Sequence, residues 1–401
     1  MIVLIANLGS TSFKYKLYAI KNGNEQVLAE GAADRIGQGA SDWSVDVPGR
    51  EGTTDKQADG NTDIADHGEA IELHLVQLKE LGAINDISDV QAIGFKAVHG
   101  GPISGAVIVD DDVIATMQDF ADVAPQHNPP YIAAMKAFKA KLPNVPQVAA
   151  FETAFHQTIP LSRQVYGIPK EWIEDHGIRR YGFHGASHRY IATRMSEIDP
   201  SVKKIISCHL GGSCSICAIE DGKSVGNSFG MTAQSGTFHA SRVGDFDAFA
   251  LLKLIESGLS VDEIFNTLGK EAGLKGLSGV SADMREVEVA AEQGDAQAQL
   301  ALDAFVESCR HYVGSFLAAL NGADAIVFTG GVGQYGKDVR TGICKDLNFA
   351  GIALDSTLND SAKGSQETKL NKEGTPTQIW VLPTNEELIV ARQTVGVLQN
   401  N

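Results

Sequence analysis

Residues 204–222 read KIISCHLGGSCSICAIEDG, and this stretch decides the fold. Its apolar start leads into the polar, glycine-rich segment 209–213, after which residues 215–219 alternate and Asp221-Gly222 closes the run. Apolar runs separated by short Gly, Ser and Asp segments are typical of β-hairpins. The stretch therefore predicts a strand, a tight turn, a second strand and a second turn.

The same pattern occurs near the N-terminus, where residues 2–20 read IVLIANLGSTSFKYKLYAI, so that residues 7–12 align with residues 209–214. A third glycine-rich turn, 329–333, follows an apolar strand predicted at 325–328. Backbone N–H groups and hydroxyls in such turns can bind anions, most often phosphate. One turn alone could be only a turn. Three in comparable contexts predict a duplicated fold whose phosphate-binding hairpins face one cleft.

The composition is that of a soluble globular protein with two or three domains. The 401 residues are 43% hydrophobic and 21% charged, and the net charge is −17. That charge argues against binding to nucleic acid or to an anionic membrane, because both require a basic surface. No apolar run reaches membrane-spanning length, and MIVLIA is too short for a signal-peptide core.

The five cysteines, an odd number, indicate a reduced, cytoplasmic protein. Cys214 and Cys217 form a single C-x-x-C pair, which could bind a metal or carry redox chemistry. Both lie in the second predicted strand of the hairpin, so we favour the simpler interpretation that they are small buried residues.

Predicted strands alternate with predicted helices through both halves, which indicates an α/β protein with two similar domains. Further strands are expected at 90–95, 145–151 and 379–382. Helices are expected at 70–81, 131–141, 247–256, 261–268, 305–320 and 385–398, with a charged amphipathic region at 282–304 and an exposed loop at 355–373.

Phosphoryl transfer requires positive charge around the moving group, a metal ion and in-line positioning. Basic candidates near strand or loop ends are Lys14, Lys96, His184 and Arg242. Oxygen ligands for a metal could come from Asn7, Glu152 and Glu386, since Mg²⁺ takes few carboxylates and completes its shell with phosphate and water.

Three of the basic candidates also have a structural interpretation. Lys14 could be a solvent-facing residue of its strand, and Arg242 could pair with Asp245 or Asp247. His184 could cap a helix. From the spacing alone, the sequence predicts a phosphate-handling enzyme and nothing narrower.

The motifs taken together resemble the acetate kinase (acetokinase) family, over nearly the whole length. The segments that carry the resemblance are Asn7-x-Gly9-Ser10-x-Ser12-x-Lys14, Tyr181-Gly182-Phe183-His184-Gly185-x-Ser187-His188, His127-Asn128-Pro129, Gly222-Lys223-Ser224, Gly276-Leu277-Ser278-Gly279, Phe328-Thr329-Gly330-Gly331-Val332-Gly333 and Pro383-Thr384-Asn385-Glu386-Glu387. The second of these is long enough to be highly specific.

The resemblance implies a duplicated sugar kinase/Hsp70/actin-like (ribonuclease H-like) α/β fold with two domains around a cleft. The expected domains are residues 1–152 with 386–401, and a nucleotide-binding domain at 153–385. It also implies a cytoplasmic homodimer that phosphorylates a short-chain carboxylate, acetate or propionate, reversibly with ATP and Mg²⁺ (or Mn²⁺). The alternatives are a kinase for a larger or more polar acid, and a weakly active nucleotide-binding paralogue.

The resemblance also assigns roles to individual positions. Glu152, His184 and Arg242 are the expected catalytic residues, and Asn7 and Glu386 the metal-associated ones. Expected substrate residues are Lys96, Val98, Gln126, Phe183 and Ala233; expected phosphate-binding residues are Asn7, Ser10 and Ser12. Expected nucleotide-binding residues are Lys14, His209, Leu210, Gly211, Gly212, Ser213, Asp283, Met284, Arg285, Gly331, Val332, Gly333, Gln334 and Tyr335.

The chain departs from the family pattern at the acidic and basic positions. Lys96 stands where the family has Arg, and Glu152 where it has Asp. A planar bidentate group has thus become a point charge, while its acidic neighbour has gained one methylene. The two changes could compensate, or they could reduce activity, because a misplacement of about 1 Å can cost about 10²-fold in rate.

Further departures lie at positions that the family uses for the acyl group and the nucleotide. Gln126 replaces Leu and Ala233 replaces Pro in the acyl pocket, which suggests a more polar acid. Gly212 replaces Asn, and Gln334-Tyr335 replaces Glu-Asn, which suggests a changed preference for the nucleotide base.

Overall fold

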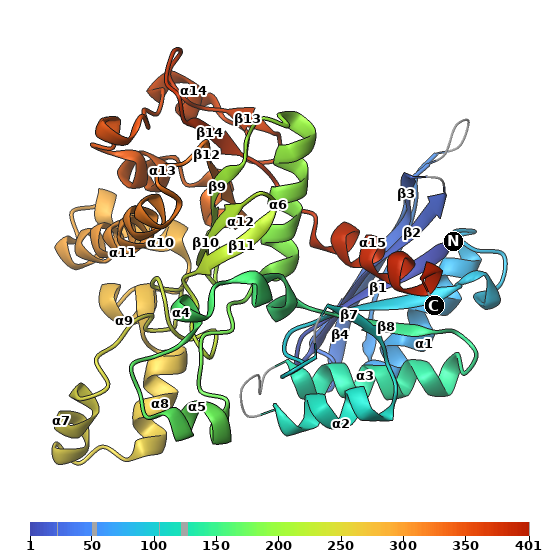
Figure 1. Cartoon of the computed structure of the whole chain (residues 1–401). Helices are drawn as coiled ribbons and strands as arrows, with labels where there is room; N and C mark the ends of the chain where they lie inside the picture. The colour runs from blue at the N-terminus through green and yellow to red at the C-terminus, as the bar shows by residue number, and fades with distance from the viewer. Residues whose placement is uncertain (22, 50–53, 104, 122–126, 401) are drawn as a thin grey trace. The chain divides into compact units, whose positions relative to one another are not determined.

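The computed structural model describes residues 1–21, 23–49, 54–103, 105–121 and 127–400. The chain forms two compact units, Met1–Ala154 with Asn385–Asn401 (unit 1) and Phe155–Thr384 (unit 2) (Figure 1). Each unit contains one mixed sheet with helices packed on it.

Unit 1 contains an eight-stranded sheet in the order β5-β4-β3-β2-β1-β6-β8-β7. The strands are β1 (Ile2–Leu8), β2 (Ser12–Lys21), β3 (Asn24–Asp34), β4 (Ala40–Val47), β5 (Lys56–Asp63), β6 (Ala92–Ala97), β7 (Ala106–Ile108) and β8 (Gln147–Phe151). The helices are α1 (His67–Glu80), η1 (Ile87–Asp89), α2 (Asp111–Asp119), α3 (Asn128–Lys141) and α15 (Glu386–Gln399), with η2 (Glu152–Thr158) following β8. Strands β1 to β5 form an antiparallel meander, whereas β1, β6 and β8 run parallel.

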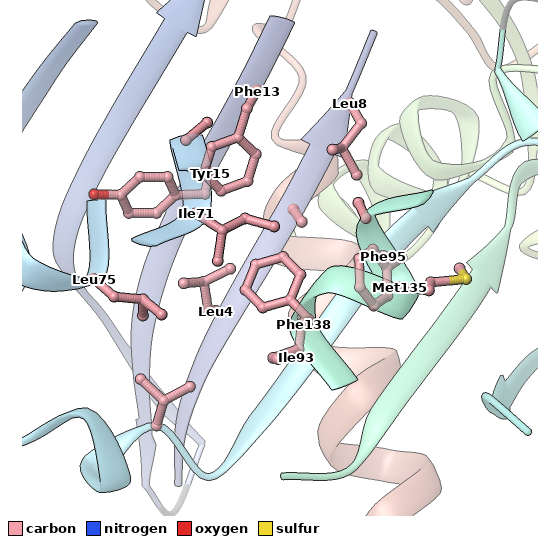
Figure 2. Close-up of a cluster of buried hydrophobic side chains, with 14 of the residues drawn as sticks. Leu4, Leu8, Phe13, Tyr15, Ile71, Leu75, Ile93, Phe95, Met135 and Phe138 are labelled. Carbon is pink, nitrogen blue, oxygen red and sulfur yellow. The ribbon is translucent and has the colours of Figure 1, made fainter. Parts of the chain in front are cut away.

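Alternation along the strands of unit 1 produces two apolar faces. Leu4 and Leu8 of β1 join a core that includes Phe13 of β2 and Phe138 of α3 (Figure 2). Residues of α1 belong to the same core. Their neighbours Val3 and Ile5 face the other way and pack with Val390 and Val395 of α15. Because both faces are covered, β1 is buried on both sides and reads as a continuous apolar run.

Unit 2 contains a six-stranded sheet in the order β11-β10-β9-β12-β14-β13. The strands are β9 (Lys204–His209), β10 (Ser215–Glu220), β11 (Lys223–Asn227), β12 (Ala325–Thr329), β13 (Thr368–Lys369) and β14 (Gln378–Val381). The helices are α4 (Leu161–Gln164), α5 (Lys170–His176), α6 (Gly185–Ile198), α7 (Ala250–Glu256), α8 (Val261–Lys270), α9 (Gly273–Ser278), α10 (Met284–Glu292), α11 (Ala296–Leu320), α12 (Gly330–Tyr335), α13 (Lys337–Cys344), η3 (Asn348–Ala350) and α14 (Ser356–Ser361).

The two sheets share one topology, which confirms the duplicated α/β fold. Strand β1 lies between antiparallel β2 and parallel β6, and β9 lies in the same way between β10 and β12. The correspondence continues outward, from β3 to β11 on one side and from β8 to β14 on the other. The two glycine-rich turns recognised in the sequence therefore close equivalent hairpins.

Three local predictions were wrong. The segment 355–373 is not an exposed loop, because it contains α14, β13 and the fully buried Leu370. The glycine-rich turn at 329–333 is instead the start of α12, directly after β12. The helix expected at 305–320 begins earlier, at Ala296 in α11, where Asp295 caps it through the N–H groups of Gln297 and Ala298.

None of the helices in the described ranges is both long enough and apolar enough to cross a membrane. All five cysteines lie within those ranges, and each is a buried free thiol.

Candidate active site

Five polar side chains meet where the parallel strands of unit 1 end. This carboxyl-edge cluster consists of Asn7, Lys96, Tyr131, Glu152 and Glu386. Asn7 lies near the end of β1, Lys96 near the end of β6, and Glu152 directly after β8. Parallel strands bring their carboxyl ends to one edge of a sheet, which is where ligands bind in open α/β sheets. Glu386 reaches the cluster from the first residue of α15.

A buried cation joins the two carboxylates of the cluster. The Nζ atom of Lys96 forms an ion pair with Glu386 and lies 3.6 Å from Glu152 Oε1. The side chains are only 16% (Lys96), 12% (Glu386) and 6% (Glu152) exposed. Burial alone would lower the pKa of Lys96, but the attraction of Glu386 and Glu152 outweighs it and raises that pKa well above its usual value. Lys96 is therefore charged at neutral pH, and with both carboxylates ionised these three side chains carry a net charge of −1.

Tyr131 connects this edge to β1. Its hydroxyl accepts a hydrogen bond from the Leu8 N–H at 3.1 Å and donates one to Asn7 Oδ1 at 3.3 Å. Burial raises the pKa of Tyr131, so the phenol remains neutral and can donate. Tyr131 thus fixes the orientation of the Asn7 amide oxygen.

The cluster offers oxygen atoms of the type that Mg²⁺ prefers, from Asn7, Glu152 and Glu386. Among the described residues, no three His, Cys, Asp or Glu side chains gather closely enough to hold a metal ion by themselves. A small set of protein oxygens suits Mg²⁺ when nucleotide phosphates and water complete its coordination. The residues therefore fit a nucleotide-bound Mg²⁺ better than a permanently held structural ion.

The other predicted residues of unit 1 lie close to this edge in the chain. Ser10 and Ser12 lie in and directly after the β1–β2 turn, which the Gly9 N–H closes on the Ser12 carbonyl at 3.0 Å. Lys14 is exposed and lies across from Asn7 in the ladder. Val98 is buried directly after β6. The predicted substrate residue Gln126 lies outside the described residues.

Unit 2 contains a cavity of about 850 Å³ beside the ends of β9 and β12. Its lining comes mainly from three glycine-rich or helix-start segments of the chain. The lining residues are Gly211, Gly212, Ala240, Leu274, Ala282, Asp283, Met284, Arg285, Glu288, Gly331, Val332, Tyr335 and Gly336. A volume of several hundred Å³ with a largely apolar lining suits a nucleotide-sized ligand.

The cavity brings together most of the predicted nucleotide-binding residues, from three separate segments. Other predicted residues, such as Leu210, Gly333 and Gln334, do not line the cavity. Leu210 is fully buried and its carbonyl accepts the Gly333 N–H at 3.1 Å, so these two residues join the first segment to the third. Gln334 turns away and donates to the Gly364 carbonyl at 2.8 Å.

The sequence predicted no role for Arg340, which supports the predicted nucleotide-binding segment 331–335. Its side chain is fully buried and donates to the carbonyls of Gly333 (2.9 Å) and Gln334 (2.8 Å) and to Asn359 Oδ1 (2.7 Å). Buried arginines are rare unless their donors are satisfied. The guanidinium therefore holds the end of α12 against α14, and nothing in the sequence distinguishes it from a surface arginine of an amphipathic helix.

The predicted catalytic histidine of unit 2 occupies an unusual backbone position. His184 precedes α6 with φ 56° and ψ 33°, a left-handed conformation that non-glycine residues adopt only where surrounding structure requires it. Its Nδ1 atom lies 2.9 Å from Ser215 Oγ, and its ring lies 4.1 Å from that of His209. His184 does begin a helix, but its side chain makes no cap bond; it is held toward β10 instead.

Arg242 and the predicted acyl residue Ala233 are half-buried in unit 2, whereas Phe183 is buried. Arg242 donates to the Ala233 carbonyl rather than to Asp245, whose carboxylate accepts from Gly236 and Tyr312. Burial lowers the pKa of Arg242 from its usual value.

The chain is similar to known kinases over nearly its whole length. The model of the acetokinase family matches residues 2–392. Acetate kinase of Natranaerobius thermophilus is 41% identical over 99% of this chain and 100% of its own, and that of Bacillus subtilis is 39% identical over 98% of each. The crystal structure of Porphyromonas gingivalis acetate kinase aligns with TM-score 0.89 and 37% identity, and that of a propionate kinase from Francisella tularensis with 0.88 and 33%, each over 99% of both chains. The chain belongs to the acetokinase family.

Proposed function

We propose that this protein transfers a phosphoryl group reversibly between ATP and a short-chain carboxylate, acetate or propionate. The observation that carries the proposal is the buried Lys96 between Glu152 and Glu386 at the carboxyl edge of unit 1. Three desolvated charges at a strand edge are costly to stability and are expected at a functional site. The acetate and propionate kinases to which the chain is similar support the choice of substrate.

The chemistry requires charge stabilisation more than proton abstraction. A carboxylic acid substrate is already ionised at neutral pH, so its oxygen can attack without a general base. We assign to Lys96, His184 and Arg242 the donation of hydrogen bonds to the phosphoryl oxygens as the charge on them redistributes. Glu152 orients Lys96 and does not remove a proton.

Asn7 and Glu386 would hold the divalent cation, with Glu152 nearby. When bound, Mg²⁺ supplies charge neutralisation for the nucleotide phosphates. Lys96 already supplies a positive charge beside Glu386. With a dication bound, the ion and these three side chains would together carry +1 instead of −1, which would suit an anionic carboxylate.

The nucleotide binds in the cavity of unit 2, with phosphates toward the segment 211–213. The base is placed against Tyr335, Met284 and the backbone of Gly331, all of which line the cavity. Gly212 has no side chain where the family has Asn, so the segment 211–213 binds phosphate through its backbone.

Contacts with the acyl chain are assigned to Val98 in unit 1 and to Phe183 and Ala233 in unit 2. A kinase for a larger acid is the second candidate, motivated by Ala233, which leaves more room than the Pro common in the family. We further propose a cytoplasmic homodimer, in accordance with five free thiols and with an apolar face on α7 and α8.

The test is acyl phosphate formation, trapped with hydroxylamine from purified protein, ATP and Mg²⁺ over acetate, propionate, butyrate and small hydroxy acids. We expect product with acetate or propionate, and none from the Glu386→Gln control. A signal only with a larger or hydroxylated acid would favour the second candidate. No product from any acid, with ATP still bound, would refute the proposal.

A further inference from the structure

Four side chains of unit 2 form a continuous hydrogen-bonded series that ends at His184. Ser207 Oγ lies 2.9 Å from His188 Nδ1, His188 Nε2 lies 2.8 Å from Ser215 Oγ, and Ser215 Oγ lies 2.9 Å from His184 Nδ1. The first three residues are completely buried. Bulk water therefore does not reach these hydroxyl and imidazole groups.

The pattern of the strands explains why the series forms. Ser207 lies opposite Cys217 in the ladder, and Ser215 pairs with His209, so these side chains share one face of the sheet. Apolar residues of that face, such as Ile205 and Cys217, pack against α6. The serines are the polar exceptions on an apolar face, and they meet the histidines carried by α6 and by the residue before it.

Each member has few hydrogens to donate, so the direction of the series can be deduced. A serine hydroxyl donates once, and a neutral imidazole carries one N–H. If His188 carries its hydrogen on Nε2, it donates to Ser215, Ser215 donates to His184 Nδ1, and Ser207 donates to His188 Nδ1. Every hydrogen within the series then has an acceptor, and His184 must carry its own hydrogen on Nε2.

The opposite direction is less favourable. His188 would donate from Nδ1 to Ser207, and the Ser207 hydroxyl hydrogen would have no acceptor among the hydrogen bonds of the described residues. A buried donor without an acceptor is destabilising. Burial, together with His156 and His209, lowers the pKa of His188 well below its usual value, so the ring is neutral and must choose one direction.

We infer that Ser207, His188 and Ser215 are positioning residues that fix His184 as the Nε2–H tautomer, so that it presents a hydrogen-bond donor to the transferring phosphoryl group. The inference rests on the proposed role of His184 in phosphoryl transfer. Phosphoryl oxygens only accept hydrogen bonds, and the other tautomer would direct a lone pair at them. The left-handed backbone of His184 is consistent with a side chain whose direction matters.

The direct test is the protonation of the imidazole nitrogens in the full-length protein, labelled with ¹⁵N-histidine and observed by long-range ¹H–¹⁵N NMR. His184→Gln and His188→Gln assign the two sets of signals. We expect both rings to be protonated at Nε2 and not at Nδ1, and Ser215→Ala to convert His184 into a mixture of tautomers. A wild-type His184 protonated at Nδ1, or a tautomer unchanged by Ser215→Ala, would overturn the inference. Because this needs no substrate, it stands even if no acid is phosphorylated.

A matched control is available in the same unit. Ser224 Oγ lies 2.8 Å from His156 Nδ1, so Ser224→Ala removes one buried serine–histidine bond outside the series. We expect it to lower the unfolding temperature about as much as Ser215→Ala without altering the His184 signals. Equal disturbance of His184 by both variants would mean that Ser215 has only a structural role. If Ser215→Ala does not fold, Ser207→Ala provides the same test from the far end of the series.

Kinetics give a second readout on the wild-type reaction. Ser215→Ala should lower kcat about 10- to 100-fold and change the KM for ATP less than about threefold, because the lost interaction is made in the transition state. Ser215→Thr, which retains the hydroxyl, should recover most of kcat. An increase confined to KM, or no recovery with Thr, would contradict a positioning role.

Discussion

Lys96 and Glu386 form a buried ion pair between residues 290 positions apart in the chain, and this pair joins β6 to the first turn of α15. Glu152 approaches the same ammonium group from the end of β8. Three segments that meet only in the folded unit thus share one buried positive charge. Its properties can be tested in several ways.

The Lys96 and Glu152 substitutions should compensate each other. We expect Lys96→Arg and Glu152→Asp each to lower kcat/KM by about tenfold or more, because each changes the reach of one partner at a 3.6 Å contact. The double variant should recover activity, with a coupling energy of about 1–3 kcal/mol in a double-mutant cycle. Lys16 and Glu30, an exposed pair also at 3.6 Å, provide the control, where the same exchanges should leave activity unchanged. Strictly additive losses at Lys96 and Glu152 would contradict compensation.

Removal of the Lys96 charge should strengthen metal binding while it weakens the fold. Lys96→Met leaves two buried carboxylates without their cation, which should cost about 3–5 kcal/mol of stability. We expect the variant to bind Mn²⁺ more tightly than the wild type in the absence of nucleotide, measured by EPR titration, and to regain thermal stability when Mn²⁺ is added. Addition of Glu386→Gln should abolish that gain. Weaker Mn²⁺ binding by Lys96→Met would mean that the lysine does not compete with the metal.

Arg340 should influence nucleotide affinity more than turnover. Arg340→Met removes the donors that hold the Gly333 and Gln334 carbonyls, so we expect the KM for ATP to rise about tenfold with a smaller change in kcat. Arg310→Met is the matched control, because Arg310 holds the carbonyls of Gly342, Ile343 and Lys345 at the other end of α13. It should lower the unfolding temperature and leave the KM for ATP unchanged. Equal effects on KM would refute a specific link between Arg340 and the nucleotide.

The stability of unit 1 should fall in mild acid because of His74. Burial lowers the pKa of His74 to about 4, and neither ring nitrogen has a hydrogen-bond partner within the described residues. Below about pH 6.5 the unfolded chain gains a proton that the folded unit refuses, so stability is greatest above that pH and is lost as the pH falls toward 4. The loss between pH 7 and 5 should be about 2 kcal/mol.

The measurement can be confined to unit 1. Trp43 is the one tryptophan of that unit, and its ring lies against His74, so Trp172→Phe and Trp380→Phe leave a local fluorescence probe. Urea unfolding should show a flatter pH dependence in His74→Phe than in the parent. An unchanged slope between pH 7 and 5 would assign the effect to other groups.

The apolar face of α7 and α8 should form the dimer contact. Phe249 is 79% exposed, and Leu252, Val261 and Phe265 are also exposed on the same helix pair. Such a group on a protein surface is typical of an interface. We expect Phe249→Glu to convert the dimer to a monomer in light scattering, whereas Phe349→Glu, at another exposed phenylalanine, should not. A wild-type monomer would refute the proposed assembly.

Local patterns in the sequence were sufficient to predict the duplicated fold. The apolar pattern of the strands and the composition of the glycine-rich turns at 9–12 and 210–214 can each be recognised within a few residues. Elements stabilised by pairing with distant segments were harder to predict. Strand β13 has two residues and forms because it pairs with β14, and polar β5 forms because it extends the meander beside β4. Neither carries a strong periodic signal of its own.

The sequence identified the types of residue in the site but not the contacts between them. Asn7, Glu152 and His184 stand at strand or loop ends, where the sequence can identify them. The Lys96–Glu386 pair depends on α15 returning to the first sheet, and the orientation of His184 depends on Ser207 and Ser215, which look like ordinary strand serines. These relationships arise from packing, for which a single sequence contains no local signal.

The return of α15 to unit 1 has a consequence for the order of synthesis. Val390 and Val395 complete one apolar face of the first sheet, and Glu386 provides the partner of Lys96. The ribosome makes all of unit 2 between Ala154 and Asn385, which takes on the order of 10–50 s at about 5–20 residues per second. During that interval one apolar face of the first sheet lacks its helix, and Lys96 and Glu152 lack the charge of Glu386. The unit begun first is therefore the one finished last, and the carboxyl-edge cluster is incomplete in any chain that ends before Glu386.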